Sequence, residues 1–125
     1  MSRRPKVFAN WPETLVPSYG PYRGIVEWHI DGDTYDVFMD LGINIYIYLV
    51  VRLLGVDTPE TNRGSTRLAG LAATEYVRSI MPEGSPVLLK TRKTDSFGRY
   101  LAEITLVDGH SLSVLIIDAG FGVAA

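Results

Sequence analysis

The stretch INIYIYLVVRLLGVDTPE, residues 43–60, indicates the fold more clearly than any other part of the chain. Its first residues alternate aliphatic side chains with others, and this period of two predicts a β-strand. The odd-numbered positions from Ile43 to Val51 are expected to face a core, whereas Arg52 on the even face is expected to point into a cleft. The strand then ends in Asp-Thr-Pro-Glu, so that charge gathers where the apolar pattern stops.

Composition restricts the chemistry available to this chain. It has 125 residues, 46% of them hydrophobic and 21% charged, which is typical of one globular domain. The absence of cysteine excludes disulfides, thiolate zinc sites and thiol nucleophiles. With only two histidines, any metal is expected to be a hard, oxygen-ligated ion. The net charge of −2 argues against coating nucleic acid by bulk electrostatics, but not against an enzyme that holds a divalent cation among acids.

Nothing in the sequence predicts export or membrane insertion. The start, MSRRPKVFANWPE, is basic but has no apolar run of signal-peptide length behind it. The longest apolar stretch, residues 45–51, is far too short to cross a bilayer. We therefore expect a cytoplasmic or otherwise intracellular protein without a membrane partner, although a mature secreted protein given an added Met would share these features.

The pattern predicts an irregular N-terminal arm, residues 1–21, followed by one domain, residues 22–125. The arm is expected because prolines cluster there. Strands are predicted in the segments GIVEWHI (24–30), TYDVFM (34–39), INIYIYLVVR (43–52), SPVLLKTRK (85–93) and RYLAEITLV (99–107). These segments predict a mainly β (α+β) protein, a five-stranded OB-fold barrel with a helix between strands 3 and 4 and a short C-terminal helix.

Two segments have helical spacing. RLAGLAATEYVRSI, residues 67–80, repeats apolar side chains at Leu68, Leu71, Ala72, Tyr76 and Ile80. SLSVLIIDAGFG, residues 111–122, places Leu112, Leu115, Ile116 and Ala119 on one face and ends with Gly120 as a cap. The β-branched run in this second segment leaves a strand as the alternative.

Three charged clusters lie beside the predicted strands: DGDT at 31–34, DTPE at 57–60 and TDSFGR at 94–99. Each cluster alone fits a plain turn or a solvated loop. An EF-hand is excluded, because counted from Asp31 its required Gly and Glu positions hold Asp36 and Gly42. All three together, each at the end of an apolar strand, favour a common function.

The function that these clusters together would fit is phosphodiester cleavage, which needs a metal, a positioned water, a base and cations on the phosphate oxygens. Asp33 and Asp57 could hold a calcium ion together with a backbone carbonyl and waters. Glu60, three residues after Asp57, could orient or deprotonate a water beside it. Arg52 and Arg99 can each donate a fork of N–H groups to phosphate.

The same clusters, in the same order, resemble the signatures of the staphylococcal (thermonuclease-type) nuclease family. The resemblance rests on DGDT at 31–34, RLLGVDTPE at 52–60 and TDSFGRYLA at 94–102, and extends over most of the chain. It implies an OB-type barrel and a calcium-dependent nuclease, endonuclease or exonuclease, acting on DNA and RNA. Its products would carry 3′-phosphates.

The resemblance also implies roles for single residues. Asp33 and Asp57 would be carboxylate ligands of Ca²⁺, Thr58 would supply its main-chain carbonyl, and Asp31 would support the site. The three catalytic residues would be Arg52, Glu60 and Arg99.

Substrate contacts are expected at Phe97 and Lys90. Phe97 stands where the best-known member of the family has a tyrosine, so it can stack on a base or sugar but offers no hydroxyl. The hairpin within residues 35–51 looks long and could form an oligomer contact or a strand-binding platform.

The alternative is a non-catalytic OB-fold module that binds nucleic acid or protein. Such a module has no chemical reason to keep acids where a polyanion must lie, because without a metal these acids would repel it. The presence of all five signature acids and arginines favours catalysis.

Overall fold

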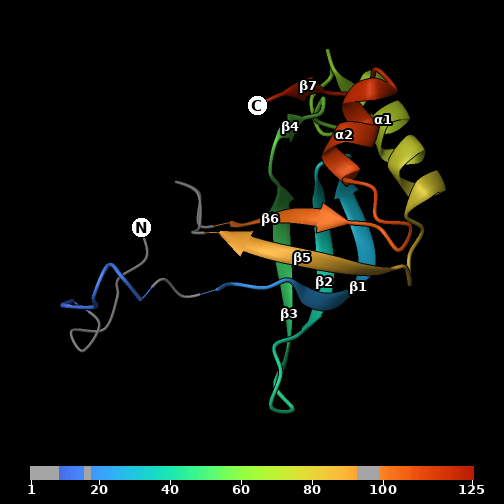
Figure 1. The fold of residues 1–125 in the computed structure, drawn as a ribbon. Helices are drawn as coiled ribbons and strands as arrows, with labels where there is room; N and C mark the ends of the chain where they lie inside the picture. Colours follow the sequence, from blue (N-terminus) through green and yellow to red (C-terminus); the bar gives the residue numbers. More distant parts are fainter. Residues whose placement is uncertain (1–8, 16–17, 93–98) are drawn as a thin grey trace.

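The computed structural model describes residues 9–15, 18–92 and 99–125. Its elements, in chain order, are β1 (Tyr22–Asp31), β2 (Thr34–Asp40), β3 (Tyr46–Leu53), β4 (Val56–Asp57), α1 (Arg67–Ile80), β5 (Pro86–Arg92), β6 (Tyr100–Thr105), α2 (Leu112–Asp118) and β7 (Val123–Ala124). The predicted five-stranded barrel is confirmed, since the strands close in the order β1-β2-β3-β6-β5 (Figure 1). As predicted, α1 lies between the third and fourth barrel strands, and the short α2 follows the fifth.

The barrel is closed by two pairings between strands that are distant in sequence. β1 pairs antiparallel with β5, and β3 pairs in parallel with β6 through Val51–Leu53 alone. The core fills the interior with residues from all five strands and both helices. Its fully buried members include Val26, Tyr35, Val37, Met39, Val51, Leu53, Val56, Val77, Met81, Leu89, Ile104, Leu112 and Ile116.

The elements beyond the barrel are divided between its two ends. α1, α2, β4 and β7 lie together at one end, and the β2–β3 hairpin projects from the other (Figure 1). β4 and β7 form a separate two-stranded sheet, which the sequence did not predict. None of the described helices is both long and apolar enough to cross a lipid bilayer.

The prediction that the odd face of residues 43–51 lies in the core is wrong for its first half. Val51 is fully buried, but Ile43, Ile45 and Ile47 are 90%, 49% and 40% exposed. The strand itself begins at Tyr46, after a turn in which Ile43 and Asn44 have positive φ. The reason is tertiary, because β3 gains its second neighbour, β6, only at Val51.

The predicted helix is confirmed at Arg67–Ile80, but its buried side differs from the apolar pattern. The buried residues are Gly70, Ala73, Thr74 and Val77, whereas Leu68 is 82% exposed. Small side chains face inward because the helix lies against the backbone that follows β4. A Cβ at Gly70 would lie 2.7 Å from the carbonyl carbon and oxygen of Glu60.

The second helix is confirmed as α2, and the alternative of a strand is wrong. Leu112 and Ile116 are buried, and Gly120 follows with φ +82, the left-handed conformation of a helix-terminating glycine. Ala119, expected on the same apolar face, is exposed. It is the C-cap residue and lies beyond the last helical turn.

The described parts of the N-terminal segment are mostly exposed, and the Tyr19 carbonyl joins the barrel by accepting hydrogen bonds from the Thr91 N–H and the Thr91 hydroxyl. The boundary between arm and domain stays a prediction. The predicted turn at residues 94–98 lies outside the described residues.

We expect Gly70→Ala to destabilise the protein by about 1–3 kcal/mol, because the added methyl group must push α1 away from the Glu60 backbone. Urea denaturation measures this loss. Gly64→Ala is the matched control, since nothing lies within 4 Å of a Cβ at that position. Equal stability of the two variants would show that the close approach of α1 is not a constraint.

Candidate active site

The turn after β1 brings the first acidic cluster to the end of the barrel where β4 lies. A register shift between His29 and Asp31 marks a β-bulge just before this turn, and such bulges redirect side chains at strand ends. Asp31 accepts two hydrogen bonds through Oδ1, from the Thr61 N–H at 3.2 Å and from the Thr61 hydroxyl at 2.7 Å. Asp31 therefore holds Thr61, the residue that follows the DTPE segment, in place.

Asp33 joins the two signature segments directly. Its Oδ2 accepts the Thr58 N–H at 2.9 Å, and its Oδ1 accepts the Thr34 hydroxyl at 3.0 Å. Its own carbonyl accepts the Leu53 N–H at 2.8 Å. With the residue only 6% exposed, the orientation of this carboxylate is determined by its partners.

Arg52 links the same acid to the second one. Nη1 donates to the carbonyl oxygens of Leu53 and Val56, the latter at 2.8 Å. Nη2 donates to Asp57 Oδ1 and lies 3.4 Å from Asp33 Oδ2. The guanidinium is thus held by backbone oxygens on one side and lies between two carboxylates on the other.

The tyrosine beneath this cluster is fully buried and donates its hydroxyl hydrogen to the Gly32 carbonyl. Burial raises the pKa of Tyr35 well above its usual value, the negative charge of Asp33 raises it further, and Arg52 opposes both effects. Tyr35 therefore stays neutral and supports the DGDT turn from below.

Arg99 comes directly before β6, the strand that pairs in parallel with β3. Arg52 on β3 and Arg99 therefore lie on neighbouring segments. They line one hollow of about 190 Å³ together with Leu53, Leu54, Gly55, Val56, Leu101 and Ala125. The structure therefore brings Arg52 and Arg99 to the same surface depression.

Glu60 lies beside this cluster but its carboxylate turns elsewhere. Oε2 is 2.9 Å from Arg63 Nε, and the side chain is 52% exposed. Its carbonyl accepts the Thr66 hydroxyl at 2.9 Å, at the N-terminus of α1. Sequence reasoning missed Arg63, although opposite charges three residues apart were the available signal.

Of the two expected substrate contacts, only Lys90 lies in the part of the chain that the structure describes. Lys90 is exposed on β5 opposite Glu103, and Phe97 lies outside the described residues.

The donors at this corner fit a hard cation. The carboxylates of Asp33 and Asp57 both lie against Arg52 Nη2, and each offers the oxygen ligands that a hard cation prefers. The Thr58 hydroxyl oxygen is buried and has no hydrogen-bond partner among the described residues. In residues 9–15, 18–92 and 99–125, no three acidic or histidine side chains gather around one point, so backbone, water or substrate would complete the shell.

Comparison with known proteins agrees with this geometry. The model of the family described as "Staphylococcal nuclease homologue" matches residues 50–125, well over half of the chain. The chain belongs to this family. The resemblance seen in its three charged clusters is therefore confirmed at the level of the family.

One curated relative is Endonuclease YhcR of Bacillus subtilis (strain 168), 26% identical over 111 residues. The alignment covers 82% of this chain but only 9% of YhcR, so the similarity concerns one part of a much longer protein.

We expect Arg52→Met to destabilise the protein by about 3 kcal/mol, because it leaves the buried Asp33 carboxylate without its cation. Combined with Asp33→Asn, the loss should be smaller than the sum of the two single losses. Urea denaturation of the three variants measures this coupling.

Arg23→Met is the control for this cycle. It removes another arginine bound to an aspartate, Asp40, but the Arg23 side chain is 81% exposed. Exposed pairs contribute little, so its effect should be much smaller. Equal losses at Arg23 and Arg52 would contradict the role assigned to burial.

Proposed function

We propose that this chain is a calcium-dependent nuclease that hydrolyses phosphodiester bonds in DNA, and in RNA as well, to products with 3′-phosphates. The observation that carries the proposal is the position of Arg52, held between Asp33 and Asp57 at a hollow that Arg99 also lines. Membership of the nuclease family and the similarity to a protein named an endonuclease support it.

Asp33 and Asp57 would hold Ca²⁺ with their carboxylates, Thr58 would add its main-chain carbonyl, and Asp31 would support the site through Thr61. Bound calcium would supply a positive charge that polarises the phosphate and neutralises its oxygens. Asp33 is already oriented for this role by its bonds to Thr58 and Thr34.

The arginines would neutralise the charge that develops on the phosphate. The Nη1 bonds of Arg52 to two carbonyl oxygens fix the guanidinium plane before substrate arrives. With a cation held by Asp33 and Asp57, Arg52 Nη2 would donate to a phosphate oxygen in place of these carboxylates. Arg99 would donate from the other side of the hollow, and preorganised donors of this kind are worth most in the transition state.

Glu60 would orient a water molecule or take its proton. The water oxygen would bond to phosphorus as the bond from phosphorus to the 5′-oxygen breaks, and the leaving 5′-oxygen would take a proton from solvent water to become a hydroxyl. This requires Glu60 to leave Arg63. Exposed ion pairs contribute at most about 1 kcal/mol, so the exchange is energetically accessible.

We expect Glu60→Gln to lower the cleavage of a labelled single-stranded DNA oligonucleotide by about 10²–10⁴-fold, because the amide cannot accept the proton of the water. Wild-type cleavage should require calcium and cease in EDTA. The assay compares initial rates at saturating substrate.

The matched control is Glu75→Gln, which removes an acid from a second pair of the same spacing, Glu75–Arg78, on the exposed side of α1. It should cleave like wild type. Substrate binding without cleavage by the wild-type protein would instead indicate the non-catalytic module.

We expect calcium to raise the melting temperature, because an ion bound by the native state alone stabilises it, by about 2.7 kcal/mol at a hundredfold excess over Kd. Asp33→Asn should abolish this rise. Asp118→Asn, at the exposed end of α2, is the control and should keep it. A rise that persists in Asp33→Asn would place the calcium elsewhere, whatever the result of the cleavage assay.

A further inference from the structure

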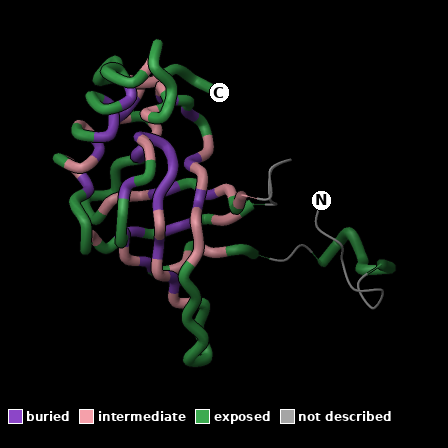
Figure 2. The backbone as a smooth tube through the Cα atoms, turned by 180° about the vertical axis from the view of Figure 1, so that it is seen from behind, coloured by how far each residue is buried: buried purple, intermediate pink, exposed green. Residues whose placement is uncertain are grey.

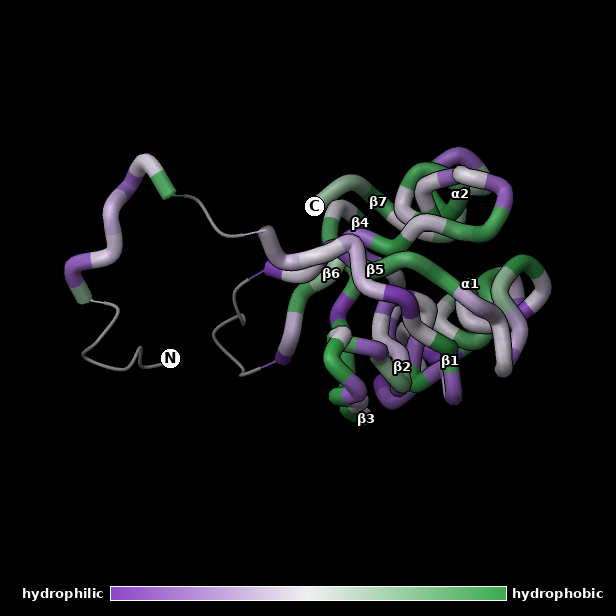
Figure 3. The backbone as a smooth tube through the Cα atoms, turned by 60° about the horizontal axis from the view of Figure 1, so that its bottom comes forward, coloured by the Kyte–Doolittle hydropathy of each residue, from purple (hydrophilic) through white to green (hydrophobic). Residues whose placement is uncertain are grey.

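The β2–β3 hairpin projects from the barrel as an exposed arm (Figures 1 and 2). From Leu41 to Val51 it carries no charged side chain. Figure 3 shows hydrophobic stretches along its free end. Exposed β-ribbons of soluble proteins usually carry lysine, proline or bulges that prevent pairing with other chains, and this hairpin lacks them.

Both faces of the hairpin expose apolar side chains, and the face with the tyrosines also carries Asp36 and Asp40 of β2. On one face Phe38 stacks with Tyr46 at 5.5 Å between ring centroids and with Tyr48 at 4.5 Å, and the two tyrosines are 53% and 71% exposed. On the other face Ile45 and Ile47 are 49% and 40% exposed. So much exposed apolar surface marks an interaction site.

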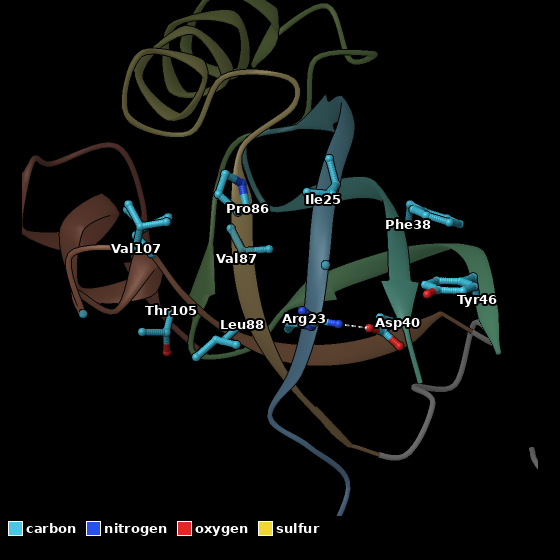
Figure 4. A pocket seen from close by; sticks show the side chains of 13 residues that line it. Arg23, Ile25, Phe38, Asp40, Tyr46, Pro86, Val87, Leu88, Thr105 and Val107 are labelled. Carbon is cyan, nitrogen blue, oxygen red and sulfur yellow. Dashed lines mark hydrogen bonds and ion pairs between the residues drawn. The ribbon is translucent and has the colours of Figure 1, made fainter. Parts of the chain in front are cut away.

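The aromatic face continues into a groove of about 570 Å³ on the outside of the barrel (Figure 4). Phe38 and Tyr46 lie at one side of it, and Leu88 and Val107 lie toward the other. The apolar surface therefore extends from the hairpin onto the barrel wall.

One edge of β3 is open over most of its length. β3 pairs with β2 from Tyr46 to Arg52, but within the described chain its other edge meets a strand, β6, only from Val51. Hydrogen-bonded pairs alternate along an antiparallel ribbon. Since the Leu41 N–H donates to the Ile45 carbonyl, the backbone groups of Tyr46 and Tyr48 point to the open edge, and those of Val50 point to the place where β6 begins.

We propose that two copies of this chain pair antiparallel through the open edges of β3, with the two-fold axis between their Tyr48 residues. In this register Tyr48 lies opposite Tyr48 of the second copy, where the two residues can exchange backbone hydrogen bonds, and Tyr46 lies opposite Val50 at the point where β6 begins. The aromatic rings come together on one face, and Ile47 meets Leu49 of the second copy on the other.

A second copy fits this edge better than a nucleic acid does. Binding of a nucleic-acid strand relies on cations that contact phosphates, and the segment offers none. Arg52, which follows the segment on β3, lies against Asp33 and Asp57. Arg23 on β1 is bound to Asp40. The pKa of that carboxyl is lowered by hydrogen bonds from the Gly42 N–H and from Arg23, so these charges already satisfy one another. An uncharged edge meets its own copy without repulsion.

Sedimentation equilibrium of the full chain tests the proposal. The wild-type protein should be a dimer, and Tyr48→Lys should raise its dissociation constant more than about tenfold, because two like charges then face each other across the axis. Ile43→Lys, at the hairpin tip and outside the paired segment, should dimerise like wild type. A monomeric wild type, or equal effects of the two variants, overturns the proposal.

Mixing Tyr48→Lys with Tyr48→Glu should restore a heterodimer, because the charges are then opposite. Since the chain has no cysteine, Tyr48→Cys offers a second test that does not depend on charge. Directly opposed residues of a hydrogen-bonded pair lie about 5.5 Å apart at Cα, within reach of a disulfide. Mild oxidation should cross-link Tyr48→Cys and not Ile43→Cys, and the reverse result would exclude this register.

Discussion

The guanidinium of Arg52 is the constraint on which the rest of the site depends. It donates to the carbonyls of Leu53 and Val56 and lies against the carboxylates of Asp33 and Asp57. These contacts join the end of β3 to the turn after β1 and to β4. The Arg52 side chain, which is only 14% exposed, thus connects these three segments of the chain.

The barrel makes this connection possible because the C-terminal end of β3 pairs with β2 on one side and with β6 on the other. Antiparallel pairing places Arg52 opposite Thr34, next to Asp33, and parallel pairing places it opposite Leu101, close to Arg99. The acids and the second arginine therefore reach one corner because of strand register. Without both pairings the same residues would lie on unrelated loops.

The same strand has different surroundings at its two ends. Its C-terminal residues are buried and bear the charged corner, while its N-terminal half extends beyond the barrel with an apolar, open edge. A strand rises about 3.3 Å per residue, so pairing centred on Tyr48 is four residues away from Arg52 and leaves that corner accessible. In the proposed dimer the two Arg52 corners would lie toward opposite ends of one continuous sheet.

The sequence by itself determined the five barrel strands, the two helices and the identity of the clustered residues, but not the small β4–β7 sheet. A period of two predicts β3, spacing near 3.6 predicts α1 at its observed bounds, and the ordered clusters at 31–34 and 52–60 predict one site. These features are local, or depend on residue types at short spacing, and so they can be read without a structure. The family match, which covers residues 50–125, confirms the family; the roles of the residues in these clusters stay predictions.

Only the tertiary structure decided which members of each pattern are buried. Ile43 and Val51 belong to one alternation, yet the first is 90% exposed and the second 0%, because β6 arrives only at Val51. Leu68 of α1 faces outward because Gly70 and Ala73 allow the closer approach to the Glu60 backbone. The pairing of Glu60 with Arg63 likewise depends on side-chain positions. Burial is set by what packs against a face, and that neighbour comes from elsewhere in the chain.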